Sequence, residues 1–212
     1  MSTEFGDLYN VSPHLGGFDV MASAWNSTHP SVHTKMAMGW ITPNQVGTHN
    51  FGNTTYRLHA VGLRHPPPPG RVAAIKVPSH TGVGHFVVEA RLPVDQYEIV
   101  NNSNDGLPSQ GVIVYQVLGE LNVLLRTPIA LQVNQQYTNA GESLVIRVDS
   151  SIPGGMQISV SRTAGALCAQ IANKIGSLNE DLETVEDINE RKEIFKELGR
   201  LRRQADQLGC NL

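Results

Sequence analysis

The spacing of apolar residues changes along the chain, and its last quarter has the clearest pattern. Two runs of apolar residues step by three or four positions, one from Leu167 to Val185 and one from Ile194 to Leu208. This spacing places their side chains on one face of a helix. The polar stretch Glu186–Arg191 separates the two runs. Residues 163–212 are therefore predicted to form a helical hairpin.

A different pattern occupies residues 46–162, where short runs rich in Val, Ile, Tyr and Thr lie between clusters of Gly, Pro, Asn and Asp. Tyr56–Val61 and Met156–Val160 alternate with period two, as half-buried strands do. Seven strands are predicted, at Thr55–Val61, Val72–Val77, His85–Leu92, Gly111–Leu118, Ile129–Val133, Leu144–Val148 and Met156–Val160. Short strands at this spacing favour an antiparallel sandwich or barrel.

The first 45 residues are rich in Gly, Ser, His and Met, and only Thr28–Trp40 has a helical pattern. Pro30 lies where a first helical turn tolerates proline, and Gly39 would end the helix. The predicted fold class is α+β in three parts. Residues 1–45 hold a turn and a helix, residues 46–162 form an antiparallel, sandwich-like β domain, and residues 163–212 form the hairpin.

Composition and charge limit the classes of partner that the chain is expected to bind. Of the 212 residues, 40% are hydrophobic and 17% charged, which is a globular rather than a disordered composition. The net charge is −3, so we expect no nucleic-acid partner, because phosphate-binding surfaces carry a basic excess. No apolar run approaches the roughly 20 residues of a membrane span. The first residues also lack a signal-peptide pattern, so any export signal is expected to lie outside this sequence.

Five segments carry a resemblance to a known family. They are Asp7–Asn10, Gly16–Ser23, His29–Ile41, His85–Arg91 and Gly106–Tyr115. In this order they resemble the immune-inhibitor-A-like zinc metallopeptidases of bacteria. In that family a His-Glu-x-x-His zinc helix is followed by an acidic segment, an Asp-x-Met turn, a His-Pro helix ending in Leu-Gly-Trp, and two strands. The resemblance implies a secreted enzyme that acts on protein or peptide substrates.

The chain departs from the family at the zinc helix, because no histidine in it is followed by glutamate. Two histidines four residues apart bind the zinc, and the glutamate between them is the general base. Without them no zinc-bound water is activated, so we expect no catalytic residue and no activity from this chain alone. Asp7 matches the acidic segment, as a leftover third zinc ligand or as an exposed turn acid. Met21 matches the turn methionine, a packing element that supports the site.

Two other groups of residues leave alternatives open. His29 and His33 are four residues apart and could bind a metal, but we expect His29 to cap the start of the helix and support the site. Asp95, Glu98 and Asp105 lie in one predicted loop. They could form a glycosidase-like carboxylate pair or a calcium site, and solvated turn acids are the preferred interpretation.

Cys168 and Cys210 lie at the two ends of the predicted hairpin. When the two apolar stripes are folded back about Asn189, the position numbers of facing residues add to a nearly constant value, and the two cysteines follow this rule. We therefore predict a disulfide that closes the hairpin. Such a bond implies an oxidising compartment and agrees with an extracellular location.

These observations together predict a function. The chain is expected to be the non-catalytic rear part of a secreted zinc metallopeptidase, completing and scaffolding the active-site cleft. The competing hypothesis is a stand-alone β-sandwich that binds a polysaccharide or a cell-surface protein. A peptidase part would leave an apolar face near Met21 and Trp40 uncovered, which could also lead to a homodimer.

Overall fold

The computed structural model describes residues 15–21, 28–80, 83–100, 106–119, 122–208 and 210. The chain forms two compact units. The first comprises residues up to Thr138 together with Val145–Ser161, and the second comprises Asn139–Leu144 and Arg162–Leu212. The first two regions expected from the sequence thus share one unit, because the helix near residue 35 packs on the sheet rather than apart from it.

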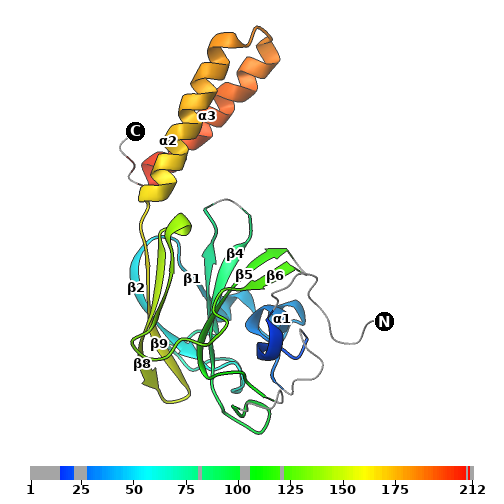
Figure 1. Ribbon diagram of the computed structural model, residues 1–212. Coiled ribbons are helices and arrows are strands. Elements are labelled where there is room, and N and C mark those ends of the chain that lie inside the picture. Colours follow the sequence, from blue (N-terminus) through cyan, green and yellow to red (C-terminus); the bar gives the residue numbers. More distant parts are fainter. Residues whose placement is uncertain are drawn as a thin grey trace. The chain divides into compact units, whose positions relative to one another are not determined.

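Two sheets form most of the first unit (Figure 1). In the five-stranded sheet, β3, β4, β5 and β6 pair antiparallel in that order and β1 runs parallel to β3. The second sheet has the order β2-β9-β8-β7. The strands are β1 (Val46–Thr48), β2 (Gly52–His59), β3 (Ala74–Pro78), β4 (His85–Arg91), β5 (Gly111–Gly119), β6 (Asn122–Leu125), β7 (Gln136–Asn139), β8 (Leu144–Ile152) and β9 (Gly155–Arg162).

The centre of the five-stranded sheet is covered on both faces. Six of the seven β4 residues and seven of the nine β5 residues are buried, with no alternation. Helix α1 (Val32–Ala37) lies on one side of this sheet, and β8 and β9 lie on the other (Figure 1). On the α1 side the core includes Phe18, Val32 and Tyr115, all essentially inaccessible to solvent.

Six predicted strands match observed ones to within a few residues, and one is wrong. Residues 129–133 form no strand and make only an isolated bridge between Leu131 and Val112. The strand in that part of the chain is β7, which starts later and is half polar. Its four residues are exposed or half-buried, so its sequence has no run of apolar residues that would predict a strand. Two short strands, β1 and β6, were also missed.

Helix α1 is shorter than the sequence pattern suggested. It begins after Ser31, whose hydroxyl accepts a hydrogen bond from the backbone N–H of Thr34 at 3.2 Å. Ser31 is therefore the N-cap, and His29 is not. Pro30 lies before the helix, while Gly39 follows its end with φ +73°, in the left-handed region that glycine adopts most easily.

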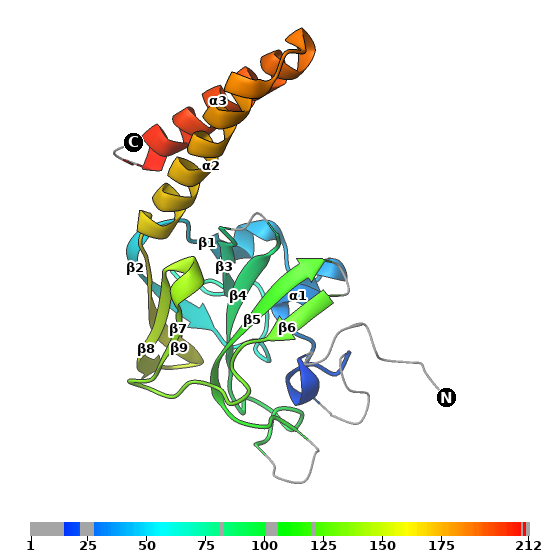
Figure 2. The same ribbon diagram turned by 45° about the horizontal axis from the view of Figure 1, so that its top comes forward.

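The second unit contains the predicted hairpin, α2 (Gly165–Thr184) and α3 (Ile188–Leu208), which lie side by side (Figure 2). A disulfide joins Cys168 to Cys210 with their Cα atoms 5.4 Å apart, so the predicted pairing is confirmed. Apolar side chains of both helices form a small core. Its members are Ile171, Leu201 and Ala205, with Ile175, Leu178 and Cys210 packed around them.

Candidate functional site

A buried carboxylate, that of Asp19, ties a turn to the start of α1. The 3-10 turn η1 (Gly16–Phe18) leads Asp19 into the interior, where the residue is fully buried. Asp19 Oδ1 accepts a hydrogen bond from the backbone N–H of Met21 at 2.8 Å. Its Oδ2 accepts from the N–H of Ser31 at 3.0 Å and from Thr34 Oγ1 at 2.7 Å. Met21 is thereby held to the helix start, through charge-assisted hydrogen bonds that offset the burial of Asp19.

Two residues of the five-stranded sheet, Glu89 and Tyr115, also bind the start of α1. The backbone N–H of Val32 donates to Glu89 Oε2 at 2.8 Å, and the Tyr115 hydroxyl donates to the same oxygen at 2.8 Å. The N–H of His33 donates to the Tyr115 hydroxyl oxygen at 3.2 Å. The first amides of a helix have no partner within the helix. Here β4 and β5 supply those partners, which fixes α1 on the sheet.

Arg91 links this network to the loop after β4. Its guanidinium is fully buried between two carboxylates, with Nη1 3.3 Å from Glu89 Oε1 and Nη2 paired with Glu98. Arg91 Nη2 also donates to the backbone carbonyl of His29 at 2.9 Å. A planar guanidinium suits several partners at once. One side chain therefore connects strand β4, the approach to α1 and the loop that carries Glu98.

A second cation, Lys35, completes the buried cluster. Its Nζ donates to the carbonyl of Val61 at 2.5 Å. Burial lowers the pKa of Lys35, and the Arg91 cation lowers it further. Burial raises the pKa of Glu89 and of Glu98, and the Arg91 cation opposes both shifts. The cluster is stable only because its cations and carboxylates lie close enough to compensate one another.

Gly62 makes room for this cluster. A Cβ at this position would lie 2.4 Å from Val94 Cγ2, 2.8 Å from Glu98 Oε2 and 3.0 Å from His29 Cδ2. Real Cβ atoms do not approach their neighbours so closely. The backbone at Gly62 therefore contacts the loop directly, and a larger residue would displace the carboxylate of Glu98.

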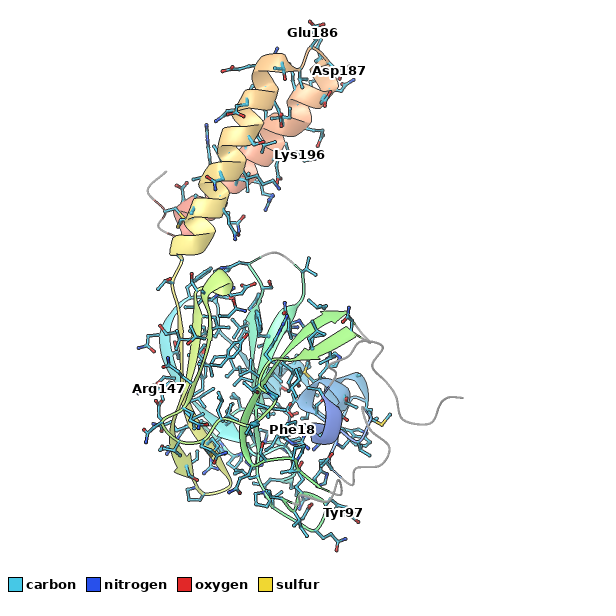
Figure 3. The ribbon with its side chains drawn as sticks, viewed as in Figure 1. Phe18, Tyr97, Arg147, Glu186, Asp187 and Lys196 are labelled. Carbon is cyan, nitrogen blue, oxygen red and sulfur yellow. A yellow bond between two sulfur atoms is a disulfide. The ribbon has the colours of Figure 1, made fainter. Side chains whose placement is uncertain are left out.

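The partly exposed edge of the site is a histidine–aspartate pair. His29 Nε2 lies 2.7 Å from Asp95 Oδ2, and Asp95 Oδ1 accepts from the backbone N–H groups of Tyr97 at 2.9 Å and Glu98 at 3.2 Å. Partial burial raises the pKa of Asp95, but the hydrogen bond from His29 and those from the two amides outweigh it and leave the pKa below its usual value. Tyr97 lies at the edge of the unit and points outward (Figure 3).

One of the loop acids, Glu98, differs from the preferred sequence interpretation. Glu98 is fully buried and paired with Arg91, and Asp95 holds His29 and two amides. Glu98 is therefore not a solvated turn acid, whereas Asp95 is an exposed acid at the start of a turn, as the sequence interpretation expected, and it also binds His29. Asp105 lies outside the described residues, as does Asp7, so the leftover-ligand hypothesis for Asp7 stays a prediction.

The described residues do not fit a catalytic zinc. Within the described ranges, no three His, Cys, Asp or Glu side chains gather closely enough to hold a metal ion. His29 and His33, the less favoured metal-binding alternative, lie in different surroundings, because His29 binds Asp95 while His33 belongs to the first turn of α1. Of the residues that the sequence suggested as supports of the site, Met21 and His29 belong to the same network, since each is hydrogen-bonded to a side chain that holds the start of α1.

Sequence reasoning missed the charged residues that build the site. Glu89 and Arg91 are two residues apart in a strand that is otherwise apolar, so they point to the same face. An acid and a base spaced in this way in a buried strand are a signal of a buried ion pair. No such sequence signal marks Lys35, because a lysine within a short predicted helix is usually exposed to solvent.

Chemically, this arrangement orients main chain rather than reacting groups. Asp19 and Glu89 both accept from backbone amides, and Arg91 and Lys35 both donate to backbone carbonyls.

Comparisons of the chain with family models, with curated proteins and with solved structures found no match. Among the described helices, none combines the length and apolarity needed to cross a membrane.

Proposed function

We propose that this chain is the non-catalytic rear part of a secreted zinc metallopeptidase. It completes and scaffolds the active-site cleft of the whole enzyme, whose substrates are proteins or peptides, and it has no peptidase activity alone. The observation that carries this proposal is the Asp19 carboxylate, which joins the turn at Met21 to the start of α1. These are consecutive segments of the family resemblance, and a turn beneath a metal site functions only when its support is rigid.

Two further observations agree with the proposal. Trp40 is 61% exposed and Met38 39% exposed just after α1, as expected for a face that another part of an enzyme covers. The Cys168–Cys210 disulfide agrees with an extracellular location, since such bonds persist in oxidising compartments. In this proposal the zinc ligands lie outside the described residues.

The test has two steps. The purified chain is first incubated with zinc and denatured casein, and we expect no chelator-sensitive cleavage. The genomic sequence upstream of Met1 is then read, and a longer product carrying His-Glu-x-x-His is expressed and assayed. In that product Asp19→Ala should lower casein cleavage strongly, while Asp206→Asn, an exposed change in α3, should leave cleavage unchanged. Absence of any upstream or separately encoded zinc helix would refute the proposal.

A second candidate function is a β-sandwich that binds a polysaccharide or a cell-surface protein by itself. One loop favours it, because Tyr97, Ile99 and Val100 are 50%, 53% and 41% exposed. Exposed aromatic and aliphatic side chains on a rigid support are typical of binding surfaces. A glycan array separates the two functions, since saturable binding that Tyr97→Ala abolishes would favour the binding module.

A further inference from the structure

A pocket of about 240 Å³ lies beside α1 and is lined by residues of that helix and of the five-stranded sheet. It is independent of the proposed peptidase role. Its apolar walls come from α1 through Val32 and Met36 and from the sheet through Val46 and Val87. Pockets that bind drug-sized molecules are larger, about 300–1,000 Å³. The size and walls of this pocket suit a small molecule with an apolar body.

The sheet wall of the pocket is built by strand register. Lys76 on β3 pairs with Val87 on β4, and Pro78 pairs with His85. Residues two apart on a strand point to the same face, so Lys76, His85 and Val87 all face the pocket, as its lining residues confirm. The helix adds His33. Three nitrogen-bearing side chains therefore share one apolar pocket.

The charge that the pocket carries is positive rather than negative. None of the lining residues that the structure describes is acidic. Burial, together with the smaller effects of Lys76 and His33, lowers the pKa of His85 to about 4, so His85 is a neutral hydrogen-bonding group near pH 7. Lys76 supplies the positive charge, and its long apolar stem lets the ammonium group sit at the rim of an apolar site.

We propose that this pocket binds a small monocarboxylate with an apolar tail. The tail fills the space between Met36, Val46 and Val87, and the carboxylate accepts hydrogen bonds from the Lys76 ammonium group and from an imidazole N–H of His85. A carboxylate is favoured over a neutral polar group because hydrogen bonds between charged groups are about twice as strong as neutral ones. An ammonium group is excluded because it would face Lys76.

The test uses three probes with the same phenylpropane carbon skeleton: 3-phenylpropanoate, 3-phenylpropanol and 3-phenylpropylamine. Each is titrated at pH 7.5 into the full chain, by calorimetry and by NMR of the histidine side chains. We expect 3-phenylpropanoate to bind about tenfold more tightly than the alcohol, a ratio typical of one charged hydrogen bond. The amine should not bind, and the resonances of His33 and His85 should shift with the carboxylate.

Lys76→Met keeps the apolar stem and removes the charge, so it should reduce the preference for the carboxylate over the alcohol to near one. The matched control is Lys196→Met, an exposed lysine of α3, which should leave the preference unchanged. Fluorescence of Trp40 checks that each variant is folded, and the comparison of probes in the unaltered chain decides the matter if Lys76→Met fails to fold. Equal binding of carboxylate and alcohol, or binding that leaves the His85 resonances unmoved, would overturn the proposal.

Discussion

The β-rich unit and the helical hairpin reach stability by different means. In the first unit, both faces of β4 and β5 are covered, and a cluster of five buried charged residues lies within the same interior: Asp19, Lys35, Glu89, Arg91 and Glu98. In the hairpin only a few apolar side chains are buried, while Ile188 and Phe195 are 70% and 59% exposed. A disulfide joins its two ends.

The difference follows from the amount of interior that each unit has. A large interior holds charged groups in fixed positions, where they position the backbone around α1. A two-helix hairpin buries too little apolar area to be stable without help, so a cross-link contributes a large share of its stability. Substitutions of buried charged residues should therefore lower the stability of the first unit. Changes to the disulfide or to helix propensity should alter the stability of the second.

The largest expected effect is that of Arg91→Met. It removes the cation between Glu89 and Glu98, which is the main charge that compensates these two buried carboxylates. Breaking a buried pair in this way costs about 3–5 kcal/mol. Trp40 lies in the first unit, and the sequence of the second unit contains no tryptophan. Urea unfolding followed by tryptophan fluorescence therefore measures this loss directly.

The matched control is Arg147→Met, whose side chain is 58% exposed and pairs with Asp149 on the surface of the same unit. It should cost less than about 1 kcal/mol. The loss in Arg91→Met should also shrink at lower pH, because the two unpaired glutamates become neutral by taking up protons. A small, pH-independent effect of Arg91→Met would show that the cluster does not hold the unit together.

Next in size is the removal of the disulfide by Cys168→Ser with Cys210→Ser. The bond closes a loop between residues 42 apart in sequence, and the chain-entropy model assigns such a loop about 4 kcal/mol. The thermal transition seen by circular dichroism at 222 nm, which follows α2 and α3, should shift to lower temperature. The fluorescence transition of the first unit should stay in place, and a joint shift of both would contradict the separation of the two units.

The hairpin was also the part that the sequence predicted best. Its turn comes earlier than the predicted stretch Glu186–Arg191, because α3 already begins at Ile188. Its apolar stripes and the pairing of Cys168 with Cys210 follow from helical spacing, which is a local property. The residues of α2 that face α3 can therefore be identified from the sequence without knowing any other part of the structure. The α+β class and the two-sheet architecture were predictable for the same reason, since strands such as β9 keep their alternation of buried and half-buried residues.

The site was predictable only in part, because its chemistry depends on partners far apart in the sequence. Glu98 has the sequence context of a loop acid, yet it is buried against Arg91. His29 was expected to cap a helix, but Ser31 does so, and Asp95, sixty-six residues later, binds the imidazole instead. Local sequence cannot state which tertiary partner a polar side chain will meet.

The two units should also lose stability in different acid ranges. Burial holds the pKa of His85 at about 4 in the folded first unit, below its usual value of about 6.5. The unfolded chain therefore takes up this proton first, and the contribution is full above pH 6.5 and lost as the pH falls towards 4. In the hairpin, the hydrogen bond from Arg200 lowers the pKa of Glu197 to about 2. Its contribution is present above about pH 4.5 and lost as the pH falls towards 2.

Variants isolate these contributions from those of other groups. Glu89 and Glu98 have raised pKa values and act in the opposite direction, but they are common to the parent chain and to His85→Phe. Between pH 6.5 and 4, the urea midpoint by fluorescence should fall less steeply in His85→Phe than in the parent. Glu197→Gln should change only the circular dichroism midpoint, below pH 4.5. If the midpoints of parent and variant depend on pH in the same way, the substituted residue does not contribute to the acid sensitivity of its unit.

The smallest effect is also the sharpest contrast, because the same substitution should have opposite signs in the two units. Gly176 lies within α2, and a Cβ there would meet nothing within 4 Å. Alanine costs a helix about 1 kcal/mol less than glycine, so Gly176→Ala should raise the hairpin transition by circular dichroism. Gly39 has φ +73°, a conformation that costs alanine roughly 1–2 kcal/mol. Gly39→Ala should therefore lower the fluorescence transition of the first unit, and a rise there would mean that the turn after α1 is not held in the left-handed conformation.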